Sequence, residues 1–190
     1  MLAIDRAWQR PSGAKTMLHV IGSTALMLQS NYVRGTKDSD VLEAADLPSD
    51  IAAELLALAG RGTSLAARHQ IYLDIVPRGL PFLPLAPVWH SLRGFSDQLV
   101  NFQVESLDIV DVTVSKLKRF NLNDQADVRA MVERGMVSHD ELVERFKSAV
   151  DRFSGDARAY DLPKCVRNLN QVERDLFLED GTEIELPDWI

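Results

Sequence analysis

A short apolar run at residues 17–21 is followed by Gly22-Ser23 and then by good helix formers as far as Gln29. An apolar run of this length, ended by glycine, is typical of a buried strand, and a serine ahead of helix formers is a plausible N-cap. The order strand, small-residue turn, helix favours an α/β fold. It would also direct the backbone amides of Gly22 and Ser23 toward a bound phosphate. The alternative is a tight turn with a helix cap and no ligand.

The hydrophobic pattern of the remaining chain predicts further strands and helices. Together they indicate a mixed sheet flanked by helices, in the α/β (α+β) class. Strands are predicted at 39–43, 70–76 and 101–107, and helices at 2–9, 48–59, 108–120, 124–134, 138–153 and 162–177. The four prolines between Pro77 and Pro87 predict a loop. We expect a core at residues 1–109 and a mainly helical C-terminal region at 110–190 packed on it. The tail, 178–190, is expected to form a hairpin or an extended arm.

Composition narrows the class of protein. With 46% hydrophobic and 26% charged residues in 190, the chain has the make-up of a folded globular protein. A net charge of -7 disfavours broad attraction to nucleic acid. Cys165 has no second cysteine to pair with, and no apolar stretch is long enough for a signal peptide or a membrane span. We therefore expect a cytoplasmic protein with no membrane partner.

Three aspartates lie within or directly beside the predicted strands. Asp38 and Asp40 are two residues apart and would project from the same face of a strand, while Asp74 interrupts the apolar run at 71–76. Neighbouring carboxylates repel each other unless a cation neutralises them, and a hard divalent cation such as Mg²⁺ prefers oxygen ligands. The alternative interpretation of the Asp-x-Asp spacing is an ordinary solvated strand edge.

The order of these motifs resembles that of the DNA polymerase beta-like nucleotidyltransferases, especially the small bacterial group that contains the AbiEii and MenT-type toxins. The segments that carry the resemblance are Gly22-Ser23-Thr24-Ala25-Leu26, Arg34-Gly35-Thr36-Lys37-Asp38-Ser39-Asp40, Leu73-Asp74-Ile75-Val76, Leu107-Asp108, Lys116-Leu117-Lys118-Arg119 and Asp124-Gln125-Ala126-Asp127-Val128. They span residues 20–131, and their order is more specific than any one segment.

The resemblance implies transfer of a nucleoside monophosphate from a nucleoside triphosphate, such as ATP, to a hydroxyl of RNA, protein or a small molecule. Mg²⁺ or Mn²⁺ is the implied cofactor. Asp38, Asp40 and Asp74 would bind the metal, and Asp74 would also be catalytic by helping to deprotonate the acceptor hydroxyl. Gly22 and Ser23 would hold the triphosphate.

The resemblance also implies roles for basic residues. Lys116 would be catalytic and would bind phosphate, and Asp124 and Asp127 share a helix face from which they could orient Lys116 or Arg119. Arg34 could pair with a carboxylate or a phosphate. The alternatives are a solvated Lys116, an exposed loop arginine, an Asp124 that caps its helix and an Asp127 in water.

One position departs from the pattern. Toxin members of the group commonly have a lysine two residues before the third aspartate, where this chain has Tyr72. Tyrosine can stack or donate a hydrogen bond, but it brings no positive charge. Two functions therefore stay open. One is an active transferase, for which the resemblance implies the toxin of a toxin-antitoxin pair with an antitoxin partner. The other is a catalytically degenerate nucleotide-binding or protein-interaction module of the same fold.

Overall fold

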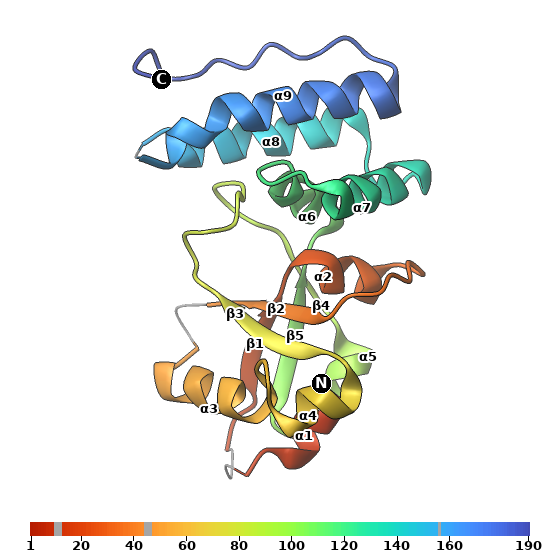
Figure 1. Ribbon diagram of the computed structural model, residues 1–190, viewed down its shortest axis with the longest axis vertical. Coiled ribbons are helices and arrows are strands. Elements are labelled where there is room, and N and C mark those ends of the chain that lie inside the picture. The colour runs from red at the N-terminus through yellow and green to blue at the C-terminus, as the bar shows by residue number, and fades with distance from the viewer. Residues whose placement is uncertain (10–12, 44–46, 156) are drawn as a thin grey trace. The chain divides into compact units, whose positions relative to one another are not determined.

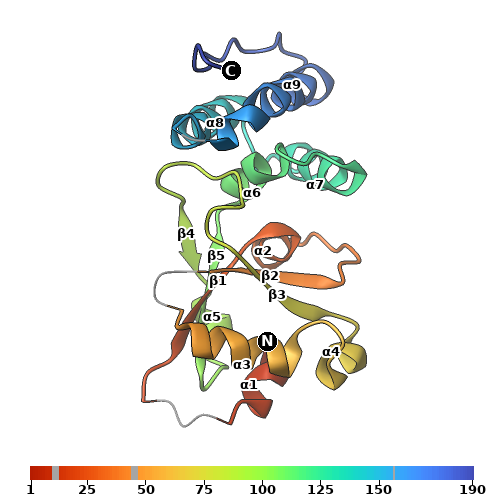
Figure 2. The same cartoon turned by 60° about the vertical axis from the view of Figure 1, so that its left-hand side comes forward.

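The computed structural model describes residues 1–9, 13–43, 47–155 and 157–190. The described chain divides into two compact units (Figures 1 and 2). Unit 1 comprises Met1–Pro81 and Trp89–Leu107, and unit 2 comprises Phe82–Val88 and Asp108–Ile190. The segment Phe82–Val88, predicted from its prolines as a loop, thus belongs with the C-terminal helices.

Unit 1 contains a five-stranded mixed sheet with the order β3-β2-β1-β5-β4. The strands are β1 (Thr16–Val20), β2 (Asp38–Leu42), β3 (Tyr72–Val76), β4 (Trp89–Ser91) and β5 (Phe102–Leu107). β1 pairs with β5 in parallel and β2 pairs with β3 in parallel, whereas β1 with β2 and β4 with β5 are antiparallel. The predicted mixed sheet is confirmed.

Helices cover one face of this sheet. They are α1 (Leu2–Ala7), α2 (Gly22–Gln29), α3 (Ser49–Ala59), α4 (Ser64–His69) and α5 (Arg93–Ser96). Figures 1 and 2 show α1, α3 and α4 gathered on the same side of the strands. Alternate strand residues point toward them and are fully or almost fully buried, among them Leu18, Val41, Leu73 and Val104. The residues between these positions belong to the opposite face.

Three short elements of unit 1 were not predicted. They are α4, β4 and α5, which have between three and six residues each. Segments this short do not repeat their apolar positions often enough to show a helical or strand period. The start of α4 is nevertheless well defined, because the side chain of Thr63 accepts a hydrogen bond of 3.2 Å from the amide of Ala66.

Unit 2 is built from helices, as predicted for the C-terminal half. They are α6 (Ile109–Lys116), α7 (Leu122–Glu133), α8 (His139–Phe153), a 3₁₀ helix η1 (Ala157–Asp161), α9 (Leu162–Val172) and a π-helix η2 (Glu173–Phe177). Phe82 places its ring against those of Phe146 and Phe153, with centroids 5.4 and 5.0 Å apart. Across the described ranges, every helix falls short of the length and apolarity needed to cross a membrane.

The C-terminal tail is the extended arm of the two forms predicted. Residues 178–190, all described, contain no strand and run beside α9 in Figure 1. Thr182 donates from its amide and its hydroxyl to the buried carboxylate of Glu173, at 2.9 and 2.5 Å. Near the end of the chain, the ring of Trp189 packs edge-on against Tyr160 with centroids 5.7 Å apart.

Candidate functional site

Gly22 lies where β1 passes into α2. Its φ is +65°, and a Cβ at this position would lie 2.7 Å from Oδ2 of Asp40. Glycine takes this left-handed conformation without strain and leaves the space that a side chain would fill. The turn at Gly22 and the carboxylate of Asp40 are therefore close neighbours, although 18 residues separate them in the sequence.

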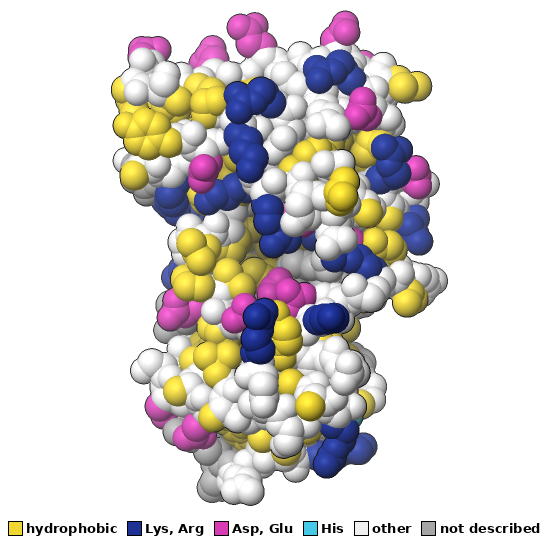
Figure 3. Space-filling view, in the orientation of Figure 1, with side chains coloured by type: hydrophobic (Ala, Val, Ile, Leu, Met, Phe, Trp, Pro, Cys, Tyr) yellow, Lys and Arg dark blue, Asp and Glu magenta, His cyan; other side chains and the backbone are white. Residues whose placement is uncertain are grey.

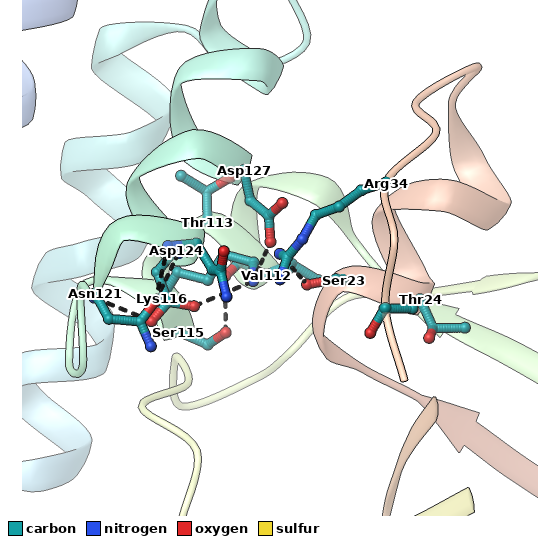
Figure 4. Close-up of polar contacts among 12 residues, drawn as sticks. Ser23, Thr24, Arg34, Val112, Thr113, Ser115, Lys116, Asn121, Asp124 and Asp127 are labelled. Carbon is teal, nitrogen blue, oxygen red and sulfur yellow. Dashed lines mark hydrogen bonds and ion pairs between the residues drawn. The ribbon is translucent and has the colours of Figure 1, made fainter. Parts of the chain in front are cut away.

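Ser23 connects this turn to the loop ahead of β2. Its hydroxyl accepts a hydrogen bond of 3.0 Å from Nη1 of Arg34 (Figure 4). The prediction that Ser23 caps α2 is wrong, because the helix begins at Gly22 and Ile21 occupies the cap position without a side-chain bond. The serine side chain instead bonds Arg34, while the predicted role of Gly22 and Ser23 in binding phosphate stays a prediction.

The three predicted metal ligands lie on β2 and β3. The parallel register places Asp40 opposite Asp74 and Asp38 opposite Tyr72. Paired residues of neighbouring strands, and residues two apart on one strand, project from the same face of a sheet. We call this face of β2 and β3 the acidic face. Asp38 and Asp40 are half-buried on it, and Asp74 is exposed.

Asp38 is held by hydroxyl groups. Thr36 donates to its Oδ1 at 2.6 Å, and the hydroxyls of Thr36 and Thr24 lie 3.1 and 3.3 Å from its backbone oxygen. The donor set of the acidic face consists of carboxylate oxygens, which suit Mg²⁺ and Mn²⁺. The side chains do not converge, however: within the described ranges, no three His, Cys, Asp or Glu residues are grouped so that they could hold a metal ion.

Tyr72 brings an arginine to the acidic face. Nη2 of Arg61 donates to the tyrosine hydroxyl at 2.6 Å, and the guanidinium carbon lies 4.8 Å from the ring centroid. The hydrogen bond to Tyr72 and the electrostatic interaction with the same residue raise the pKa of Arg61, desolvation opposes them, and the charges of Asp74 and Asp38 add smaller contributions that raise it. The Arg61 side chain is exposed.

In unit 2, Lys116 forms a buried ion-pair cluster. Its ammonium lies 2.7 Å from Oδ2 of Asp127 and 3.4 Å from Oδ1 of Asp124, and its side chain is 6% exposed (Figure 4). A lysine buried to this extent keeps its charge only when acidic partners compensate for the lost water. The carboxylates of α7 therefore fix the position of the Lys116 side chain.

Asp124 combines two roles that sequence analysis left as alternatives. It belongs to a capping box with Asn121, the residue that caps α7, so the helix begins at Leu122 rather than at the predicted residue 124. It also accepts from Nε and Nη2 of Arg119 at 2.8 and 3.0 Å. Burial alone would raise the pKa of Asp124, but the hydrogen bond from Arg119 and the charge of Lys116 lower it.

The predicted site residues thus fall into two clusters. Unit 1 holds Gly22, Ser23, Arg34, Asp38, Asp40 and Asp74, and unit 2 holds Lys116 and Asp124. Within unit 1, the register and the turn bring Gly22, Asp40 and Asp74 together. The contact of Lys116 and Asp124 with a nucleotide remains a prediction.

Sequence reasoning missed two residues of unit 1. Thr36 binds Asp38 from two positions earlier, a spacing at which threonine hydroxyls often bond to backbone groups, so the sequence contained a usable signal. Arg61 has no such signal, because its contact with Tyr72 joins a turn to a strand eleven residues later. The contact between Arg61 and Tyr72 can be recognised only from the structure, in which α4 lies between the two residues in the chain.

The fold and this cluster define a class. A mixed sheet carries a glycine turn against one strand carboxylate and a second carboxylate in register beside it, and these are residues that the motif resemblance assigned to a nucleotidyltransferase site. A family model described as "Nucleotidyltransferase of unknown function (DUF6036)" matches residues 2–176. The chain belongs to this family. No curated protein and no solved structure gives a significant match.

Proposed function

We propose that this protein is a metal-dependent enzyme that transfers a nucleoside monophosphate from a nucleoside triphosphate to a hydroxyl group. One observation carries the proposal: Asp40 lies against the Gly22 turn and in register with Asp74. The proposed anion-binding turn thus lies beside carboxylates on neighbouring strands. Membership in a nucleotidyltransferase family supports the same class of reaction.

Asp38, Asp40 and Asp74 are the residues proposed to hold Mg²⁺ or Mn²⁺. Their oxygens are the donors that these ions prefer, and three unneutralised carboxylates on one face of two strands repel one another. When bound, divalent cations neutralise the triphosphate and lower the pKa of an acceptor hydroxyl. Closure of the three side chains around a cation requires rotation of the carboxylates without a change in strand register.

The proposal also assigns phosphate binding and proton transfer to residues of the chain. The backbone amides at Gly22 and Ser23, at the N-terminus of the eight-residue helix α2, bind phosphate oxygens. Asp74, exposed on the acidic face, accepts the proton of the acceptor hydroxyl. The hydroxyl oxygen bonds to the α-phosphorus, the bond from that phosphorus to the bridging oxygen breaks, and pyrophosphate leaves. Lys116, oriented by Asp124 and Asp127, is the proposed phosphate-binding lysine.

The finer biological assignment rests on the motif resemblance. We propose a place near the AbiEii and MenT-type toxins, with ATP or another nucleoside triphosphate as donor and RNA, protein or a small molecule as acceptor. In this assignment a cognate antitoxin protein is the expected partner. Labelled triphosphates incubated with total cell RNA and protein would identify the acceptor by the fraction that acquires label.

Substitution of the carboxylates tests the proposal. Asp38→Ala and Asp40→Ala should abolish transfer of labelled nucleotide in the presence of Mg²⁺, because each removes a proposed metal ligand. Asp97→Ala is a matched control, since Asp97 is an exposed aspartate of the same unit. Circular dichroism should show all three variants folded. Transfer that persists at the wild-type rate in folded Asp38→Ala and Asp40→Ala would overturn the proposal.

A second candidate is a noncatalytic nucleotide-binding module of the same fold. It is favoured by the neutral Tyr72 on the acidic face and by carboxylates that do not group as a metal site in the described residues. Calorimetry with Mg²⁺ and each triphosphate, followed by the transfer assay, separates the two functions. Binding without transfer to any acceptor would support the module.

A further inference from the structure

Arg61 is an exposed arginine that the structure holds in one place. It lies between Gly60 and Gly62 in the turn after α3, where a long side chain would ordinarily move freely in water. Its guanidinium carbon instead lies over the ring of Tyr72, 4.8 Å from the centroid, and Nη2 donates to the hydroxyl of the same residue at 2.6 Å. A cation–π contact and a hydrogen bond with one aromatic side chain together restrict the position of the guanidinium.

Tyr72 places this charge beside the proposed metal ligands. It is paired with Asp38 in the β2–β3 register and stands two residues before Asp74, so all three belong to the acidic face. The pKa of Arg61 is raised chiefly by Tyr72, and the charges of Asp74 and Asp38 make smaller contributions in the same direction. Figure 3 shows Lys and Arg side chains directly beside Asp and Glu side chains on the surface of unit 1.

The guanidinium retains donors for a ligand. Arginine has five N–H groups in a planar fork, a geometry that matches two oxygens of a phosphate, and the described contact with Tyr72 uses one nitrogen, Nη2. When cations neutralise the carboxylates, the attraction of Arg61 to Asp38 and Asp74 weakens. A triphosphate bound at the same face then offers the nearest unneutralised negative charge.

We propose that Arg61, held against Tyr72, binds a phosphate group of the nucleoside triphosphate at the acidic face. This inference rests on the proposed function and names a further binding residue for it. Tyr72 acts as the positioning residue, since it carries no charge itself and fixes the guanidinium by stacking and by its hydroxyl. Tyr72 on β3 has no positive charge to offer a phosphate, so the charge at this place comes from Arg61 in the turn after α3.

The test compares nucleotide binding and turnover in Arg61→Gln with wild type. The KM for the triphosphate, and the Kd for Mg²⁺ with a non-hydrolysable triphosphate, should rise by about tenfold or more, the usual effect of losing a charge-assisted hydrogen bond. The rate at saturating nucleotide should change much less. The melting temperature should stay unchanged because Arg61 is exposed.

Two conservative variants and one control sharpen the result. Arg61→Lys keeps the charge but loses the planar fork, so it should restore part of the affinity. Tyr72→Phe keeps the stacking and removes the hydroxyl, so it should give a smaller rise in KM. Arg68→Gln removes an exposed arginine from the neighbouring helix α4 and should leave KM and Kd unchanged.

The outcomes separate this inference from the function on which it rests. Wild type that transfers nucleotide while Arg61→Gln keeps the wild-type KM and Kd would overturn the role of Arg61 and leave the proposed function standing. An equal loss of affinity in Arg68→Gln would reduce the effect to general surface charge and also overturn it. Wild type that neither binds nor transfers any triphosphate would overturn both.

Discussion

At the scale of single residues, the site depends on contacts that spacing alone does not show. The sequence predicted that Asp38 and Asp40 share a strand face and that Gly22 forms a turn, and the strand β2 and the turn are both present. The motif resemblance implied that this turn and the carboxylates serve one site, but spacing alone does not show the close approach of Gly22 to Asp40, because that contact depends on how β1 pairs with β2. The antiparallel pairing sets Val20, the end of β1, opposite Val41 and brings the turn that follows alongside Asp40.

Gly22→Ala tests this contact. An added methyl group would meet Oδ2 of Asp40 at 2.7 Å and would strain a backbone with φ at +65°. We expect a loss of about 1–2 kcal/mol in the free energy of unfolding, measured in urea, together with a large loss of nucleotide transfer. Gly94→Ala is the control, because a Cβ there meets no atom within 4 Å. Equal activity and stability in both variants would mean that the turn has no special role.

At the scale of elements, long segments were predictable and pairings were not. The strands and helices with five or more periodic residues, such as β5 and α8, appear close to their predicted bounds. The parallel pairing of β2 with β3, which puts Asp74 beside Asp40, joins segments separated by two helices. The register between strands that are distant in the sequence depends on packing of the whole sheet. It cannot be predicted from the residues of either strand alone.

Glu173 shows a comparable element-scale link in unit 2. Its carboxylate is fully buried at the junction of α9 and η2, and it interacts with Nε2 of His139 at 2.9 Å as well as with Thr182 of the tail. Burial opposes ionisation, but the hydrogen bonds from Thr182 and His139 lower the pKa of Glu173 below its ordinary value of 4.5. One charged group therefore ties the tail to two helices.

Because the folded state lowers this pKa, the stabilisation by Glu173 is fully present above about pH 4.5 and is lost as pH falls through the folded-state value. Glu173→Gln should therefore be less stable than wild type by about 1–3 kcal/mol at pH 7, with the difference shrinking in acid. Urea unfolding at several pH values measures this difference. A stability gap that stays constant or widens on acidification would contradict the assignment.

At the scale of the whole molecule, residue patterning and motif order were sufficient for the fold class and for the general assignment to a nucleotidyltransferase family. The mixed sheet, the helical C-terminal half and the nucleotidyltransferase family agree with the sequence analysis. The sequence did not indicate that Phe82–Val88 groups with unit 2. The prolines of this segment predict a loop but do not show which element the loop packs against. That partner is α8, through the contacts of Phe82 with Phe146 and Phe153. Packing of the C-terminal region on the core stays a prediction.

The central claim is that the protein moves a nucleoside monophosphate, and the position of the label tests it most directly. Wild-type protein incubated with Mg²⁺, a cell extract as acceptor, and a triphosphate labelled at either the α- or the γ-phosphate should transfer the α-label and release the γ-label as pyrophosphate. Asp40→Ala should transfer neither. Transfer of the γ-label, or triphosphate binding with no transfer of the α-label to any fraction, would contradict the account.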